Sequence, residues 1–552
     1  MLHLEIGADA SLHNREELLG AFGSNSGLGV WSSDEDLILA AYEKWGEACG
    51  SFLVGEFAFA IWDKRHHRLF CCRDQVGSRS FFYWRHGSRL VFGTDIRDIL
   101  AVPGVPRELN HRKFGGLATL GGYLYYDEDT FHAGIQSLPW GSSLIAEKNG
   151  LRQQAYWRPE IQPQLVPGNP MEAYEKLREL LFSAVECRIK GHSSVGVYLS
   201  GGLDSGAVTA IAAQCLQRQG RELFAFAGVV PDDLRQQFPD ERDFADVFNC
   251  FANVRINHVT TPGAGPFDNI HDPTRFVVSP RWNRALYLHE ALETAAVHSG
   301  ADVILQGTLG ELGPTCWGNT YYAELAVRGK WLTLRRELRL LQEVEGIRPW
   351  PFMARRFWEL LPISRGWPPL VLLSPDYPTS GRLLELEKCP WPDQRVNQAA
   401  FIRNCMRVHA FSGLGAWTPR HQIRMSQPLM DKRVIDFCLS APPELKVRNG
   451  YRRNLIRGAL DGILPERVQR RTSKTMFSPD YFLRYNQQLG KVRDFVSEIG
   501  IGDPIRSIID IKRLERLLEP VEMQNVDNPV LGVVPATIYA ICFLRQFEDY
   551  RR

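Results

Sequence analysis

A short glycine-rich turn between an apolar run and a helix-like run constrains this chain more than any other feature. The run Val195–Leu199 is typical of a buried strand, and Ser200-Gly201-Gly202-Leu203-Asp204-Ser205 follows it directly. Glycines lack Cβ atoms, so their N–H groups can approach phosphate oxygens closely, and the start of the next helix directs its partial positive charge to the same place. Ser200 and Ser205 can add hydroxyl donors. The pattern predicts a phosphate-binding loop.

Asp204 lies within this loop, and its carboxylate on its own would repel a bound phosphate. A divalent cation between the carboxylate and the phosphates removes the conflict. The alternative is an ordinary glycine turn in which Ser205 only caps the helix. The complete string of residues 200–205, in its strand–loop–helix context, favours the functional interpretation.

The rest of the sequence indicates two domains. Residues 52–63, 68–73, 80–85 and 89–94 resemble strands of an antiparallel meander, after a helix over 34–46 that Ser33 caps. A connector at 161–170 contains three prolines. Beyond it, helix-like stretches alternate with apolar runs, which is typical of a parallel sheet flanked by helices. We therefore expect an α+β domain over residues 1–165 and an α/β domain over 166–552. The helix-like stretches are 171–190, 206–218 and 283–299, and the apolar runs are 195–199, 223–230 and 302–305.

Composition excludes several classes of function. The 552 residues carry 65 Lys and Arg against 63 Asp and Glu, so the charge gives no reason to expect nucleic acid as a partner. No apolar run reaches the ~18–20 residues of a membrane span, and the N-terminus lacks the pattern of a secretory signal. The 11 cysteines show no C-x-x-C spacing, which favours reduced thiols. We expect a cytoplasmic protein that binds neither nucleic acid nor membranes.

Residues 200–205 resemble the pyrophosphate-binding loop of the ATP pyrophosphatases, the group that includes the asparagine synthetases. The resemblance implies an enzyme that adenylates a carboxylate with ATP and lets an amine displace AMP. It extends over almost the whole chain. Gly55–Asp63, Arg73–Gly77 and Gly134–Pro139 are similar to the glutaminase-like half of such enzymes, and Asp240-Glu241, Pro428–Asp431 and Lys474–Phe477 to the synthetase half.

Two departures from that family shape the functional prediction. A working glutaminase of this class needs a cysteine at its mature N-terminus. Here Leu2 follows Met1 and the first cysteine is Cys49, so we expect a degenerate glutaminase-like domain. In the segment Gln306–Gly313, the family register puts Glu311 in place of an aspartate that helps to hold magnesium. It puts Thr308 in place of a residue that helps to deprotonate the attacking amine in related ring-closing synthetases. Threonine cannot act as a general base near neutral pH.

Several stretches resemble one branch of the family, the lasso-peptide macrolactam synthetases. The resemblance implies that an Asp or Glu side chain of a precursor peptide is adenylated and that the N-terminal amine of the peptide closes the ring. It also implies a leader-cleaved precursor peptide, a leader peptidase and a leader-binding element as partners. Two alternatives stay open: an asparagine synthetase-like amidating or β-lactam-type ring-closing synthetase acting on a small carboxylic acid, and a catalytically dead scaffold. The stretches are 279–287, 307–311, 317–319 and 328–331.

The resemblance also assigns the site residues. It places Lys474 at the transition state, with Asp204 and Glu311 as catalytic residues that hold Mg²⁺. The alternative for Lys474 is a solvated cation, because Arg467, Arg470 and Arg471 precede it. Leu199 and Phe226 also fit ordinary core packing. The expected ATP-binding residues are Leu199, Ser200, Gly201, Gly202, Leu203, Asp204, Ser205, Phe226 and Gly307.

Overall fold

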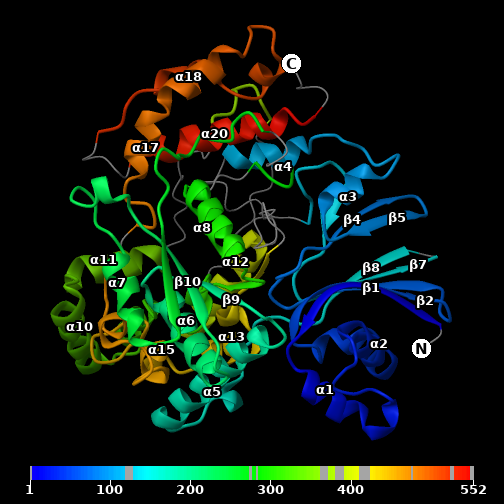
Figure 1. Ribbon diagram of the computed structural model, residues 1–552, viewed down its shortest axis with the longest axis vertical. Helices are drawn as coiled ribbons and strands as arrows, with labels where there is room; N and C mark the ends of the chain where they lie inside the picture. The colour runs from blue at the N-terminus through cyan, green and yellow to red at the C-terminus, as the bar shows by residue number, and fades with distance from the viewer. Residues whose placement is uncertain are drawn as a thin grey trace.

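The N-terminal part of the chain forms an α+β unit beside an α/β unit, as the sequence predicts (Figure 1). The first unit is coloured blue and cyan in the figure, and its sheets lie to the side of the parallel sheet that contains β9 and β10. The computed structural model describes residues 3–118, 128–148, 150–272, 277–280, 284–360, 371–378, 391–409, 423–473, 476–522 and 528–547.

The N-terminal unit contains two antiparallel sheets rather than the single meander expected from the sequence. The β4–β5 hairpin leaves the first sheet and pairs with β6. The buried Asp74 carboxylate explains the change of direction, because it accepts hydrogen bonds from the backbone N–H groups of residues 76, 78 and 79 and so closes a turn. The first sheet has the order β1 (Leu4–Leu12), β2 (Gly55–Asp63), β3 (Arg68–Arg73), β7 (Ser142–Glu147), β8 (Gly150–Ala155); the second has β5 (Arg89–Gly93), β4 (Phe82–His86), β6 (Ile135–Ser137).

Strand β2 is buried on both faces. Phe57 and Phe59 face the helix α2 (Asp34–Trp45), whereas Ala58 and Ala60 face the second sheet. Small side chains on that face let the two sheets pack closely. The expected cap of α2 is present, because the Ser33 hydroxyl accepts a hydrogen bond from the N–H of residue 36 at 3.1 Å.

The second unit is built on a five-stranded parallel sheet with the order β11-β10-β9-β12-β13. The chain runs outward from β9 through β10 to β11, and β12 then pairs with the opposite edge of β9. In parallel sheets the crevice at such a reversal, at the carboxyl ends of the strands, is where ligands bind. The strands are β9 (Val195–Tyr198), β10 (Leu223–Gly228), β11 (Val254–Val259), β12 (Val303–Leu305) and β13 (Arg424–Ser426).

Helices cover this sheet, and α6 begins three residues earlier than the sequence pattern predicts. Its first turn contains Leu203, Asp204 and Ser205, because Gly202 in the extended conformation serves as the N-cap. The helix packs against β9 and β10. The covering helices are α5 (Pro170–Ile189), α6 (Leu203–Gln217) and α8 (Leu286–His298).

The remaining helices extend both units, and α20 is among the most apolar of them. It is buried in the core, and within the described ranges no helix is long and apolar enough to cross a membrane. The helices are α1 (Arg15–Phe22), α3 (Ile96–Ala101), α4 (His111–Gly115), α7 (Arg242–Ala245), α9 (Thr320–Val327), α10 (Trp331–Glu345), α11 (Pro349–Leu360), α12 (Gln394–His409), α13 (Lys432–Ser440), α14 (Pro443–Lys446), α15 (Asn454–Ala459), α16 (Glu466–Gln469), α17 (Tyr481–Gln487), α18 (Leu489–Ser497), α19 (Ile511–Leu517) and α20 (Val530–Leu544).

Candidate active site

The loop 200–205 leaves the carboxyl end of β9 and enters α6 in a conformation that only glycine fits. Gly201 has φ +66°, and a Cβ there would lie 2.4 Å from the Cβ of Phe244. The N–H of Ser200 donates to the Ser205 hydroxyl at 3.1 Å, and the two hydroxyl oxygens are 2.9 Å apart. The first N–H groups of a helix have no partner within the helix. The local geometry is therefore that of an anion-binding turn.

The segment after β12 forms the opposite wall of the crevice. A Cβ at Gly307 would lie 2.5 Å from the carbonyl carbon of Asp204 and from the nitrogen of Ser205. A Cβ at Gly310 would lie 2.2 Å from the carboxylate oxygen Oδ1 of Asp204. Contacts this short exclude a side chain at either position. The two glycines therefore let the second wall approach the start of α6 at the place where the strand order reverses.

The Asp204 carboxylate is held by two residues distant in sequence. The Thr315 hydroxyl donates to one oxygen, and Arg453 forms an ion pair with the other. Arg453 is mostly buried, and its Nε has no hydrogen-bond partner in the described part of the chain. A buried guanidinium donor beside an anion-binding loop fits a phosphate ligand. The sequence carries no local signal for Thr315, and Arg453 is one arginine among many.

Glu311 lies on the same wall in a half-buried position. It belongs to the short 3-10 helix η8 (Gly310–Leu312), which starts against the Asp204 carboxylate. Asp204 and Glu311 thus offer hard oxygen ligands from neighbouring segments, which suits Mg²⁺. Each Asp204 oxygen accepts one bond in the structure, from Thr315 or from Arg453, so the carboxylate keeps acceptor capacity for a cation. When bound there, Mg²⁺ would offset the negative charge of the phosphates.

Arg471 braces the loop from the other side. Its Nη1 donates to the carbonyl oxygen of Gly201 at 3.0 Å, and its guanidinium forms a double ion pair with Glu241 and lies 3.7 Å from the centre of the Phe244 ring. The side chain is only 4% exposed, whereas Arg470 is 71% exposed. The arginines that precede Lys474 are therefore not all solvated, because Arg471 is buried against the loop.

Lys474 and the following Thr475 lie outside the described residues, so the assignment of Lys474 stays a prediction. Arg471 contacts the loop, and Met476 and Phe477 line a small pocket with Glu241 at the end of β10.

Leu199 and Phe226 connect the crevice to the protein interior. The N–H of Leu199 donates to the carbonyl of Phe226 at 2.9 Å, where β9 and β10 end. Both side chains are buried in the hydrophobic core, 2% and 1% exposed. Their side chains thus pack as core residues, which the sequence left open as the alternative to adenine binding.

Two family models match the two units of the chain. The glutamine amidotransferase domain matches residues 11–157, and asparagine synthase matches residues 176–531. The chain belongs to the asparagine synthase family. As a member it is an ATP-dependent carbon–nitrogen ligase, which accounts for an anion-binding crevice beside Arg453.

Relatives of this asparagine synthase family member differ in how much of the chain they match. Asparagine synthetase [glutamine-hydrolyzing] 3 of Bacillus subtilis (strain 168) is 24% identical over 576 residues, which cover 98% of this chain and 87% of the relative. Amidase chry2 of Gibberella zeae is 30% identical over 213 residues, 37% of this chain and 30% of the amidase. A solved B. subtilis glutamine phosphoribosylpyrophosphate amidotransferase covers 46% of this chain and 61% of its own, at 12% identity and a TM-score of 0.21, and supports no conclusion.

The amidotransferase unit of this family member holds its thiols in an unreactive state. Cys49, Cys71 and Cys72 are the cysteines of residues 11–157, and all three are buried. Burial raises the pKa of Cys49 to about 12 and those of Cys71 and Cys72 well above their usual value. Because the thiolate is the nucleophile, none of the three can attack glutamine near neutral pH.

Proposed function

We propose that this chain is a lasso-peptide cyclase, which adenylates an Asp or Glu side chain of a precursor peptide and joins it to the peptide's N-terminal amine. The observation that carries the proposal is a contrast within one chain. The crevice retains the parts of an adenylating site, whereas Cys49, Cys71 and Cys72 are too deeply buried to hydrolyse glutamine. An enzyme that takes its amine from its own substrate does not need that ammonia.

The proposed reaction has two balanced steps. A carboxylate oxygen of the peptide attacks the α-phosphorus of ATP and pyrophosphate leaves. The N-terminal amine then attacks the acyl carbon, AMP leaves, and the amine loses a proton. The loop 200–205 with Arg453 would bind the phosphates, and Lys474 would stabilise the charge on the leaving AMP.

The chemistry of the amine fits the residues at the end of β12. The Thr308 hydroxyl donates to the side-chain oxygen of Gln306 at 3.1 Å, and threonine cannot act as a base at neutral pH. An N-terminal amine has a pKa of about 7.7–8.0, so an appreciable fraction is already neutral without a strong base. A lysine side chain, with a pKa near 10.4, would need one.

A second candidate is an asparagine synthetase-like or β-lactam-type ring-closing enzyme that acts on a small carboxylic acid. The match to a B. subtilis asparagine synthetase over 98% of this chain favours it. On this alternative, ammonia or an internal amine attacks the adenylate of a small acid.

The release of AMP and pyrophosphate distinguishes these candidates. The purified chain is incubated with ATP, Mg²⁺ and a peptide encoded by a short reading frame beside its gene, freed of its leader, and in parallel with aspartate and ammonia. The proposal predicts AMP release with the peptide and a product lighter by one water. The same peptide with an acetylated N-terminus is the control and gives no cyclic product. AMP release with aspartate and ammonia but not with the peptide supports the second candidate. No AMP release in either reaction supports a dead scaffold.

The proposal includes partners that the family resemblance implies. A leader peptidase has to free the N-terminal amine, and a leader-binding element has to deliver the precursor. If the leader peptidase is required, the uncleaved precursor gives no macrolactam with the purified chain. Formation of the ring from the uncleaved precursor would contradict this part of the proposal.

A further inference from the structure

A buried ionic network joins the N-terminal unit to the synthetase unit directly behind the crevice. Arg188 of α5 lies between two carboxylates, with its Nε 3.3 Å from Glu56 of β2 and its Nη1 2.9 Å from Asp431. The three side chains are at most 3% exposed. The Ser426 hydroxyl, at the end of β13, donates to Glu56, and Arg79 also pairs with Glu56 at 3.2 Å. Removing one partner of such a pair leaves a buried charge uncompensated.

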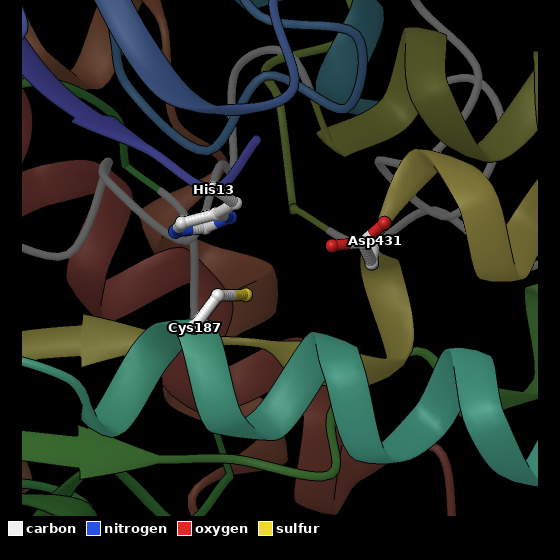
Figure 2. Close-up of side chains that lie close together, drawn as sticks. All are labelled: His13, Cys187 and Asp431. Carbon is white, nitrogen blue, oxygen red and sulfur yellow. The ribbon is translucent and has the colours of Figure 1, made fainter. Parts of the chain in front are cut away.

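His13, Cys187 and Asp431 lie close together beside this network (Figure 2). The bonds to Asp431 argue against a metal site there. The ligand atoms of the three residues lie within 4.8 Å of one another, but the Asp431 oxygens accept four hydrogen bonds, three from Arg433 and one from Arg188. Four bonds occupy the acceptor capacity of a carboxylate. Burial, with a smaller effect from Arg188, lowers the pKa of His13 to about 3, so the imidazole is neutral.

A second contact between the units reaches the wall that carries Glu311. Val76 and Trp140 of the N-terminal unit belong to the same buried apolar cluster as Leu309 and Leu312. Leu309 precedes η8, and Leu312 is its last residue. Leu309 has φ +61°, a left-handed conformation that is strained for a residue with a side chain. Burial of the leucine in this cluster offsets that strain. The bend at Leu309 therefore depends on packing supplied partly by the other unit.

The two contacts converge on one segment. Asp431 caps α13 directly after the short helix η9 (Pro428–Met430). Leu429 of η9 abuts Gly310, because a Cβ at Gly310 would lie 2.9 Å from its Cδ1, and Met430 belongs to the apolar cluster. The ionic network thus fixes η9 from one side, and the apolar cluster fixes both η9 and η8. Helix η8 starts against the Asp204 carboxylate, and η9 contacts η8 where Leu429 meets Gly310.

We propose that the N-terminal unit positions the segment 307–315 of the adenylating site. Glu56 and Val76 are positioning residues: they touch no reacting atom and act through Asp431 and Leu309. The inference rests on the family's ATP site and not on the identity of the acid or the amine. It holds equally for a peptide cyclase and for a small-molecule synthetase, so failure of the proposed function leaves it standing.

Amide hydrogen exchange of the full chain tests this role without any substrate. The N–H groups of Leu312, Gly313 and Thr315 are the reporters, since each donates to a carbonyl of residue 309 or 310 at 3.0 Å. We compare Glu56→Gln with Asp63→Asn. Asp63 is the matched control, a carboxylate on the same strand with the same 2% exposure whose partners are His66, Arg68 and Tyr42 within the N-terminal unit. Titration with Mg·ATP gives a second readout.

Glu56→Gln is expected to speed exchange of the three reporter amides about tenfold and to weaken Mg·ATP binding by a similar factor, with Asp63→Asn unchanged in both. Equal exchange of the reporter amides in the two variants, whether slow or fast, overturns the proposal. It would mean that the network contributes only to the overall stability of the protein and does not position the segment 307–315. If Glu56→Gln does not fold, Val76→Ala replaces it. We expect Val76→Ala to speed exchange of the three reporter amides more than exchange of the amides in α18. Equal acceleration of both sets would contradict the proposal.

Discussion

Gly310→Ala is the substitution for which the structure makes the sharpest prediction. The new Cβ would lie 2.2 Å from Oδ1 of Asp204, 2.9 Å from Cδ1 of Leu429 and 3.0 Å from Oγ1 of Thr315. The first distance is well below the 3.0 Å that Cβ contacts respect. Asp204 cannot turn away without breaking its contacts to Thr315 and Arg453. The methyl group therefore displaces either the carboxylate or the whole of η8.

The size of the effect follows from this geometry. Overpacking of a buried site costs about 1–3 kcal/mol of stability, so the protein still folds. A displacement of about 1 Å in a catalytic group costs on the order of a hundredfold in rate. We therefore expect a modest loss in the free energy of unfolding and a loss of two orders of magnitude in AMP formation.

Denaturant unfolding and the rate of AMP release measure the two quantities. Gly490→Ala is the control, because nothing lies within 4 Å of a Cβ there and the position is in α18. At this position in the first turn of α18 the change should stabilise by at most about 0.5–1 kcal/mol and leave AMP release unchanged. Gly310→Ala with wild-type AMP release would refute the assignment of this wall to the active site.

Three further predictions concern ionisable groups. Asp204→Asn should abolish AMP formation and leave the far-UV circular dichroism spectrum unchanged; full activity would exclude a metal-binding role. Arg453→Met should weaken ATP binding at least tenfold in a calorimetric titration, and unchanged affinity would remove Arg453 from the phosphate site. The folded pKa of His13 is about 3 against 6.5 unfolded, so its contribution to stability is complete above pH 6.5 and is lost as the pH falls toward 3. His13→Gln should therefore reduce the loss of unfolding free energy between pH 6.5 and 5 by about 2 kcal/mol, and an identical pH dependence would contradict the neutral state of the imidazole.

Local patterns in the sequence predict the elements that local forces determine. The Ser33 cap of α2 depends on neighbours in the chain, and so does the strand–loop–helix passage at 200–205. The burial of β2 on both faces matches its nearly unbroken apolar run. The opposite orientation of Cys71 and Cys72 follows from the period of a strand, and the two side chains lie in different clusters.

The features that local patterns miss depend on contacts between distant segments. Arg453 is 249 positions from Asp204, and Asp431 is 243 positions from Arg188. Nothing near either residue in the sequence marks the pairing. The split into two antiparallel sheets depends on the turn that Asp74 closes, and the left-handed Leu309 depends on packing from the other unit. These are effects of tertiary structure, which a single sequence does not encode locally.

We propose that a carboxyl group is adenylated in the crevice between β9 and β12, and the predictions for Gly310, Asp204 and Arg453 all depend on this site. The most direct test is a crystal structure of the full chain with Mg²⁺ and an ATP analogue that cannot be cleaved between its α- and β-phosphates. We expect the phosphates to contact the backbone of residues 200–205 and the guanidinium of Arg453. A nucleotide bound elsewhere, or a crevice that stays empty at saturating analogue, would contradict it.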